Sequence, residues 1–348
     1  MAVKVFLFMG QSNMQGHGNR TQLYPVPVWA QTASNGWTGA PTVSFDSGIQ
    51  YAHPTLANSP SLYTENNGGI LQYVYDAWGN YDGNSWYAAD PYHPSPRLAE
   101  SSGYGPELSF LAKYRAANPS DEIAVVKCVL GGSSITDWLP GGGMDSVWKL
   151  MVDQSIARLN AAGKTFEWAG FFWHQGENGC SSVYSYLNPT PPTFTDKTRS
   201  FFASVRDRTS SSLKIGVYRL GNHMLLDNII LPQATGGINT PENLRGATEA
   251  RRAEQWALGA EPGNFRVDTD NLPVLQTGPS QWWYHHPGTG HLAMGERTYY
   301  GFSGATPPPP PAPFRIIING GSVYDGTGSA TLDGVSIAGS DKVLNVVY

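Results

Sequence analysis

A serine follows directly on an apolar run near the start of the chain, in the sequence VKVFLFMGQSNM (residues 3–14). Residues 3–8 have the length and the β-branched and aromatic content of a buried parallel strand. Gly10 permits a tight exit, so Ser12 is expected at the carboxyl end of that strand, where open α/β sheets bind ligands. A serine there presents its hydroxyl and its own backbone N–H to one substrate atom, as acyl transfer requires.

Two further apolar runs deliver hydrogen-bond donors at their ends. Residues 122–130 lead into Gly131 and Gly132, which offer backbone N–H groups with no side chain in the way. Residues 168–173 lead into the sequence HQGE, in which Gln175 could supply a side-chain amide. Donors of these kinds stabilise the oxyanion that forms during ester hydrolysis.

A cluster of three histidines supplies the candidates for a general base: His285, His286 and His291. A metal site is a weak interpretation of this cluster, because the spacing fits no familiar set of ligands and no carboxylate lies close by in the sequence. We therefore expect neither a metal ion nor an organic cofactor.

Five short segments occur in the order of a known family: GQSNM, GPELSF (105–110), VKCVLGGSSITDW (126–138), WHQGEN (173–178) and HHPGTGHLAMGE (285–296). Together they resemble the SGNH-type hydrolases, specifically the sialate O-acetylesterase-like branch and carbohydrate esterase family six. The resemblance implies a three-layer α/β/α, flavodoxin-like fold with a parallel sheet. It also implies a serine O-acetylesterase of carbohydrates, with Ser12 as nucleophile and an oxyanion hole formed by Ser12, Gly131 or Gly132, and Gln175.

The last block of that family leaves two histidines open as the base. The family spacing of a histidine, four residues, a glycine, four residues and a glycine is met without a gap by His285, Gly290 and Gly295. His286 instead forms the His-Pro pair that many relatives carry, but it requires one residue to be deleted before Gly290. The alignment without a gap favours His285, and His286 stays the alternative.

The acid that would orient the base is where the sequence departs from the family. The superfamily places an aspartate three residues before the histidine, and Trp282 or Trp283 stands there. Asp268 and Asp270 are the nearest carboxylates in sequence and are therefore the candidates. A backbone carbonyl in their place would give a Ser-His dyad. For Glu177 we expect hydrogen bonding within its own turn.

Strands and helices alternate along the first 304 residues. The further strands are expected at 213–220 and 265–268, and the helices at 107–117, 145–162, 194–209, 241–258 and 290–300. This alternation indicates a parallel sheet that is covered on both faces. Residues 19–103 lack helical periodicity, so we expect them to hold short strands and turns over the mouth of the site.

A proline-rich segment divides the chain. We expect an esterase domain over residues 1–304, a linker over 305–313 whose TPPPPPAP sequence favours polyproline II, and a small β-rich tail or partial module over 314–348. The tail is too short to hold a stable core alone.

Composition limits the partners of the protein. Its 348 residues carry 22 Lys and Arg against 27 Asp and Glu, so the net charge of −5 provides no basic field for nucleic acid. No apolar run is long enough to cross a membrane. The 11 Trp and 18 Tyr suit sugar stacking as well as core filling. We expect an acetylated carbohydrate substrate and leave the oligomeric state open.

Two other function classes stay open. The missing aspartate is compatible with a non-catalytic sugar-binding protein on the same fold. The proline spacer and the β-rich tail are compatible with a structural or adhesion protein. No signal peptide precedes the first expected strand, and a secreted or surface-associated location is favoured over a cytoplasmic one.

Overall fold

The computed structural model describes residues 2–16, 49–51, 71–76, 87–88, 105–161, 163–180, 183–274, 285–286 and 288–307, together with the strands of the C-terminal segment. The chain divides into two compact units, Met1–Gly304 and Ala305–Tyr348. The residues with candidate chemistry all lie in the first unit.

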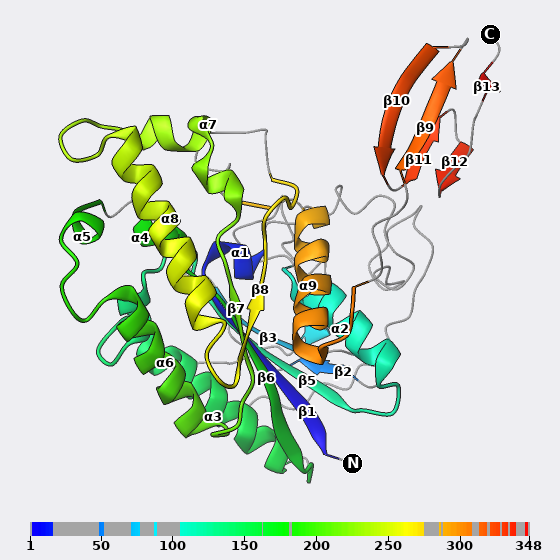
Figure 1. The fold of residues 1–348 in the computed structure, drawn as a ribbon. Coiled ribbons are helices and arrows are strands. Elements are labelled where there is room, and N and C mark those ends of the chain that lie inside the picture. The colour runs from blue at the N-terminus through cyan, green and yellow to red at the C-terminus, as the bar shows by residue number, and fades with distance from the viewer. Residues whose placement is uncertain are drawn as a thin grey trace. The chain divides into compact units, whose positions relative to one another are not determined.

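An eight-stranded sheet forms the centre of the first unit (Figure 1). Its hydrogen-bonded order is β4-β3-β5-β1-β6-β7-β8, and β2 also pairs with β5. Every pair is parallel except that of β3 with β4. The strands are β1 (Val3–Gly10), β2 (Ile49–Tyr51), β3 (Leu71–Asp76), β4 (Tyr87–Ala88), β5 (Ile123–Val129), β6 (Phe166–His174), β7 (Ile215–Tyr218) and β8 (Asn264–Val267).

The strand order reverses direction at β1, which lies between β5 and β6. Strands β2 to β5, which follow β1 in the chain, lie on one side of β1 in the sheet, and β6, β7 and β8 lie on the other side. Loops that leave such a switch point diverge, and the crevice between them is where open α/β sheets bind ligands. Gly10 is in register with Val129 and with His174, so the residues that follow these three strands meet at one edge of the sheet.

Helices cover both faces of the sheet. Helices α2 and α9 lie on one face, and α3, α6 and α8 lie on the other (Figure 1). The helices are α1 (Ser12–Gln15), α2 (Glu107–Ala117), α3 (Asp145–Ala161), α4 (Glu177–Cys180), α5 (Val183–Leu187), α6 (Phe194–Arg208), α7 (Asp227–Ile230), α8 (Pro241–Leu258) and α9 (Gly288–Ser303), with 3-10 turns η4 (Ile135–Trp138), η5 (Asn222–Leu225) and η6 (Leu231–Gln233). No described helix is both long and apolar enough to cross a membrane.

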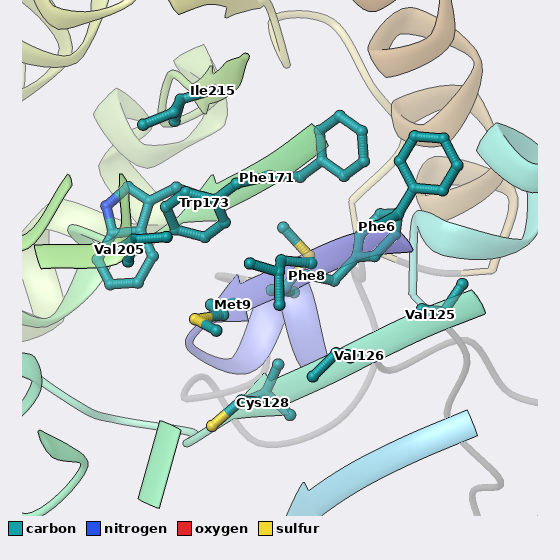
Figure 2. Packing of buried hydrophobic residues seen from close by; sticks show 14 of the residues in the cluster. Phe6, Phe8, Met9, Val125, Val126, Cys128, Phe171, Trp173, Val205 and Ile215 are labelled. Carbon is teal, nitrogen blue, oxygen red and sulfur yellow. The ribbon is translucent and has the colours of Figure 1, made fainter. Parts of the chain in front are cut away.

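The core is built from the side chains that alternate across the central strands. On one face, the ring of Phe6 lies 5.1 Å from that of Phe110 on α2 and 5.7 Å from that of Phe302 on α9, centroid to centroid. On the other face, the ring of Trp173 lies 4.7 Å from that of Phe201 on α6. Figure 2 shows β1, β5 and β6 contributing buried side chains to this core. Close packing on both faces fixes the ends of these strands.

The three-layer α/β/α fold with a parallel sheet, predicted from the alternating pattern, is confirmed by this arrangement. Some bounds differ: β7 covers less than the expected 213–220, and α9 extends the expected 290–300 at both ends. The short helices between β6 and α8 were not predicted, because they are too brief to show a period. Strands β2, β3 and β4 lie within residues 19–103, and the rest of that segment lies outside the described residues.

The second unit contains two small sheets. Strand β9 (Pro313–Ile318) pairs antiparallel with β10 (Gly321–Thr327) and parallel with β13 (Asn345–Val346). Strands β11 (Ser329–Leu332) and β12 (Val335–Ala338) form an antiparallel pair.

Candidate active site

Ser12 opens a short helix immediately beyond the end of β1 and is half-buried. The turn that precedes it requires glycine: Gly10 has a φ of +141°, and a Cβ there would lie 2.0 Å from the carbonyl oxygen of His174. The Gln11 N–H donates to the same carbonyl at 2.9 Å. The first N–H groups of a helix have no intrahelical acceptor, so the Ser12 N–H is free of helical bonding.

Gln175 follows β6 and is buried. Its Nε2 donates to the carbonyl oxygen of Ser133 at 3.0 Å and lies 3.5 Å from Oε1 of Gln11. Both amide hydrogens thus face protein acceptors, while Oε1 has no hydrogen-bond partner among the described residues. The amide connects the ends of β1, β5 and β6. Its role as an oxyanion donor stays a prediction, and it would require the amide to turn toward the substrate.

The Gly131-Gly132 turn follows β5 at the same edge of the sheet. Gly132 has a φ of +71°, and no atom of the described residues beyond its chain neighbours lies within 4 Å of the position that a Cβ would take. Its carbonyl oxygen accepts a hydrogen bond from the side chain of Asn178 on α4. The turn is therefore held by Asn178 and leaves room at Gly132 among the described residues, which suits the predicted role of its N–H groups as oxyanion donors.

His286 is buried and held in one orientation. Its Nδ1 lies 2.7 Å from the carbonyl oxygen of Pro273, and a carbonyl only accepts, so Nδ1 carries the proton and Nε2 keeps a lone pair. The backbone N–H of His286 donates to Oδ1 of Asn13 at 3.2 Å. Burial lowers the pKa of His286, and the hydrogen bond to Pro273 raises it. Burial has the larger effect, so the pKa is about 4. The ring is therefore neutral near pH 7 and able to accept a proton at Nε2.

His285 is half-buried and lies close enough to Glu177 for its charge to lower the pKa of that carboxyl. Burial is the larger influence and raises the pKa of Glu177. The Glu177 carboxylate accepts a 2.8 Å hydrogen bond from Nδ2 of Asn13. The expectation that Glu177 bonds only within its own turn is therefore too narrow, since its carboxylate reaches the nucleophile turn.

Asp268 and Asp270 bond to arginines. Both carboxylates accept from Nη2 of Arg219, at 2.7 and 2.6 Å, and Asp270 also accepts from Arg252 at 2.8 Å. Although burial alone would raise the pKa of Asp270, Arg252 and Arg219 overcome it and lower the pKa. Among the described residues neither carboxylate contacts a histidine, so this structure does not bring the two candidate acids to the base.

The two aspartates instead hold the loop after β7. Oδ1 of Asp270 accepts from the backbone N–H of Asn222 at 2.8 Å, and Asn222 begins η5. The next residue, His223, is buried, and its ring centroid lies 4.9 Å from that of His286. The network therefore supports a side chain that packs against the candidate base.

Sequence reasoning missed three polar residues of this site: Asn13, His174 and His223. Asn13 and His174 stand inside the GQSNM and WHQGEN segments, so the signal for them was their place beside Ser12 and Gln175. His174 is buried and stacks on Tyr218 at 5.0 Å, and burial lowers its pKa to about 3. No signal in the sequence distinguishes His223.

Metal ligation finds no support in the part of the chain that the structure describes. No group of three or more His, Cys, Asp or Glu side chains there could hold a metal ion.

Comparison with known proteins finds a family that matches part of the chain. Residues 79–230 match the family described as carbohydrate esterase, sialic acid-specific acetylesterase. The match covers less than half of the chain, so it is a likeness to this family over that segment. The matched residues of this carbohydrate O-acetylesterase include Gln175 and Glu177, whereas Ser12, His285 and His286 lie outside them. No curated protein matches the chain.

Solved structures resemble this acetylesterase in fold. A protein from Arabidopsis thaliana is 17% identical, with a TM-score of 0.51 over 87% of this chain and 99% of that chain. NanS is 14% identical, with a TM-score of 0.50 over 87% of this chain and 97% of that chain. A carbohydrate acetylesterase from Xanthomonas citri is 17% identical, with a TM-score of 0.45 over 90% and 59%. At these identities the first two structures are evidence for the fold alone, and the TM-score of the third is too low to add to that evidence.

Proposed function

We propose that this acetylesterase is a serine hydrolase that removes acetyl groups from a carbohydrate through an acetyl-enzyme on Ser12. The observation that carries the proposal is that the residue next to a strand-end serine bonds the backbone of a neutral histidine, which has the tautomer that a base needs. Asn13 joins the two, because it follows Ser12 and accepts from the backbone of His286. Acetylated carbohydrate is the substrate class of the family, and the sugar itself is left open.

The reaction would proceed in two halves. Nε2 of His286 takes the proton from the Ser12 hydroxyl, and Oγ attacks the acetyl carbonyl carbon. N–H groups of Ser12 and of the Gly131-Gly132 turn, with Gln175 if its amide turns, stabilise the oxyanion. The protonated histidine then gives its proton to the departing sugar oxygen. In the second half, His286 deprotonates a water that attacks the acetyl-serine, and acetate leaves as Ser12 regains its proton.

The choice of His286 over His285 rests on orientation. The Pro273 carbonyl fixes the His286 ring in the manner of the acid in a triad, which corresponds to the Ser-His dyad left open by the sequence. His285 is the alternative general base, since Glu177 lies near it and could orient it. Under that alternative the triad would be Ser12, His285 and Glu177. The two assignments differ in which histidine is indispensable.

Turnover of p-nitrophenyl acetate, with mass spectrometry of the quenched enzyme, tests the proposal. Ser12→Ala should lower kcat by about 10⁴-fold or more, because only the oxyanion donors and binding would then remain. The acetyl group should appear on a peptide that contains Ser12. His286→Asn should be nearly as severe as Ser12→Ala, and His285→Asn much milder. A Ser12→Ala enzyme with more than a tenth of the activity would reject Ser12 as the nucleophile, whereas a wild-type protein without turnover would favour a sugar-binding or structural role.

A further inference from the structure

The first turn of α2 holds a buried ion pair that the proposed chemistry does not use. Nζ of Lys127 on β5 lies 2.6 Å from Oε1 of Glu107, and both side chains are almost fully buried, at 1% and 2% exposure. The same carboxylate oxygen accepts from the backbone N–H of Gly105 at 3.0 Å. A buried pair of this kind is costly to desolvate, so its geometry is closely constrained by its hydrogen bonds.

This pair lies directly against the helix that carries the nucleophile. A Cβ on Gly105 would lie 2.5 Å from the carbonyl oxygen of Met14, 2.6 Å from Oε2 of Glu107 and 3.1 Å from Nζ of Lys127. Met14 is fully buried and stands two residues after Ser12 in α1. The backbone at Gly105 thus sets how closely α1 approaches α2.

The same turn of α2 is also in contact with the helix that follows the histidines. Oγ of Ser109 donates to the carbonyl oxygen of Leu292 at 2.5 Å. A Cβ on Gly295 would lie 2.0 Å from the carbonyl oxygen of Pro106 and 2.2 Å from Oγ of Ser109. Because α9 begins at Gly288, just beyond His286, this contact fixes the helix that the histidine loop enters.

We propose that Gly105, Glu107 and Ser109 form a brace that positions the Ser12 turn relative to His286. The brace contacts α1 on one side and α9 on the other, so its residues would act on the reaction through these two helices. This inference rests on the proposed serine mechanism. A displacement of about 1 Å between a nucleophile and its base can cost on the order of 10²-fold in rate, so the brace should act on kcat and leave KM unchanged.

Three single substitutions to alanine test the brace with p-nitrophenyl acetate as the probe. In Gly105→Ala the new methyl would displace α1, and in Gly295→Ala it would displace α9. Each should lower kcat about 10–100-fold with KM within about threefold. Gly143→Ala is the matched control, since no described residue beyond its chain neighbours lies within 4 Å of its Cβ position, and it should keep the wild-type kcat. Wild-type kcat in both folded brace variants would overturn the inference.

A double variant guards against a simple loss of folding. Glu107→Leu with Lys127→Met removes both charges together, a replacement that buried pairs often tolerate without loss of stability, and it leaves the Gly105 N–H without its acceptor. The variant should fold with a somewhat lower thermal midpoint, because the Gly105 N–H loses its acceptor, and lose about tenfold or more in kcat at unchanged KM. Recovery of full kcat in this folded variant would reject the brace. An active Ser12→Ala enzyme would instead reject the serine mechanism on which the brace depends.

Discussion

The side-chain oxygen of Asn13 accepts a 3.2 Å hydrogen bond from the backbone N–H of His286, across 273 positions of the chain. The nitrogen of the same amide donates to Glu177 at 2.8 Å. One buried side chain therefore joins the nucleophile turn to the histidine loop and to the loop after β6. Because Asn13 is adjacent to Ser12, it links the nucleophile turn to the backbone of the proposed base.

Replacing Asn13 with alanine should damage both rate and stability. The change leaves a buried backbone N–H and a buried carboxylate without their amide partner, which costs about 1–3 kcal/mol of unfolding free energy. We expect kcat to fall about 10–100-fold through misalignment of Ser12. Kinetics with a small acetate ester and urea unfolding measure the two effects. Asn188→Ala, which removes an exposed side-chain bond within one turn, should change neither.

Gln175→Ala tests the predicted oxyanion donor. Loss of one donor typically lowers kcat by about 10²–10³ with little change in KM. The bond from Gln175 to the Ser133 carbonyl is lost as well, so a decrease in stability should accompany the loss of rate. A wild-type kcat together with reduced stability would show that Gln175 only connects the strand ends.

The sequence was sufficient to predict the sheet edge on which the site lies. Apolar runs of strand length ended in Ser12, Gly131 and Gln175, and parallel strands place their carboxyl ends together. The structure brings these ends side by side, with Gly10 in register with both neighbours. The local sequence pattern is enough for this prediction. Apolar runs identify the strands, and parallel hydrogen bonding of the backbone places the carboxyl ends of those strands at one edge of the sheet.

The side-chain pairs of the site could not be predicted in the same way. Asn13 and Glu177 meet over 164 positions, and Asp270 meets Arg219 over 51. Such pairs depend on how loops pack after the fold has formed, and no local spacing encodes them. Asp268 and Asp270 were selected for their closeness to the histidines in sequence, whereas in space their carboxylates are occupied by arginines.

Asp270→Asn should therefore affect stability more than chemistry. Its carboxylate bonds two arginines and one backbone N–H, and its loss should cost about 1–3 kcal/mol of unfolding free energy. Asp268→Asn is the matched comparison, because that side chain is 42% exposed against 19% for Asp270. Both variants should keep kcat within about tenfold while folded. A loss of 10²–10⁴-fold in either folded variant, the cost of an absent orienting acid, would restore that residue as the triad acid.

The tail after the proline-rich segment should be dispensable for the reaction. All residues proposed for the chemistry lie in the unit Met1–Gly304. A chain ending at Thr306 should remain soluble and hydrolyse p-nitrophenyl acetate at near the full-length rate. Size-exclusion chromatography and kinetics check this directly, and loss of either property would mean that the tail completes the core or the site.

The pH dependence of the rate separates the two histidines. A general base acts only when it is unprotonated, and burial lowers the pKa of His286 to about 4. If His286 is the base, kcat/KM should rise as pH increases through about 4 and be level by about pH 6. An ordinary histidine has a pKa of about 6.5, and a base of that kind would shift the rise to between about pH 6 and 7.

The same shift makes the fold less stable in acid. Because the pKa of His286 is lower in the folded state than the usual 6.5, the unfolded chain binds the proton more tightly, and stability falls as pH decreases from about 6.5 toward 4. Circular dichroism at each pH must therefore confirm that the enzyme is folded before its rate is interpreted. A rise confined to pH 6–7 in fully folded enzyme would exclude His286 as the base and favour His285 with Glu177.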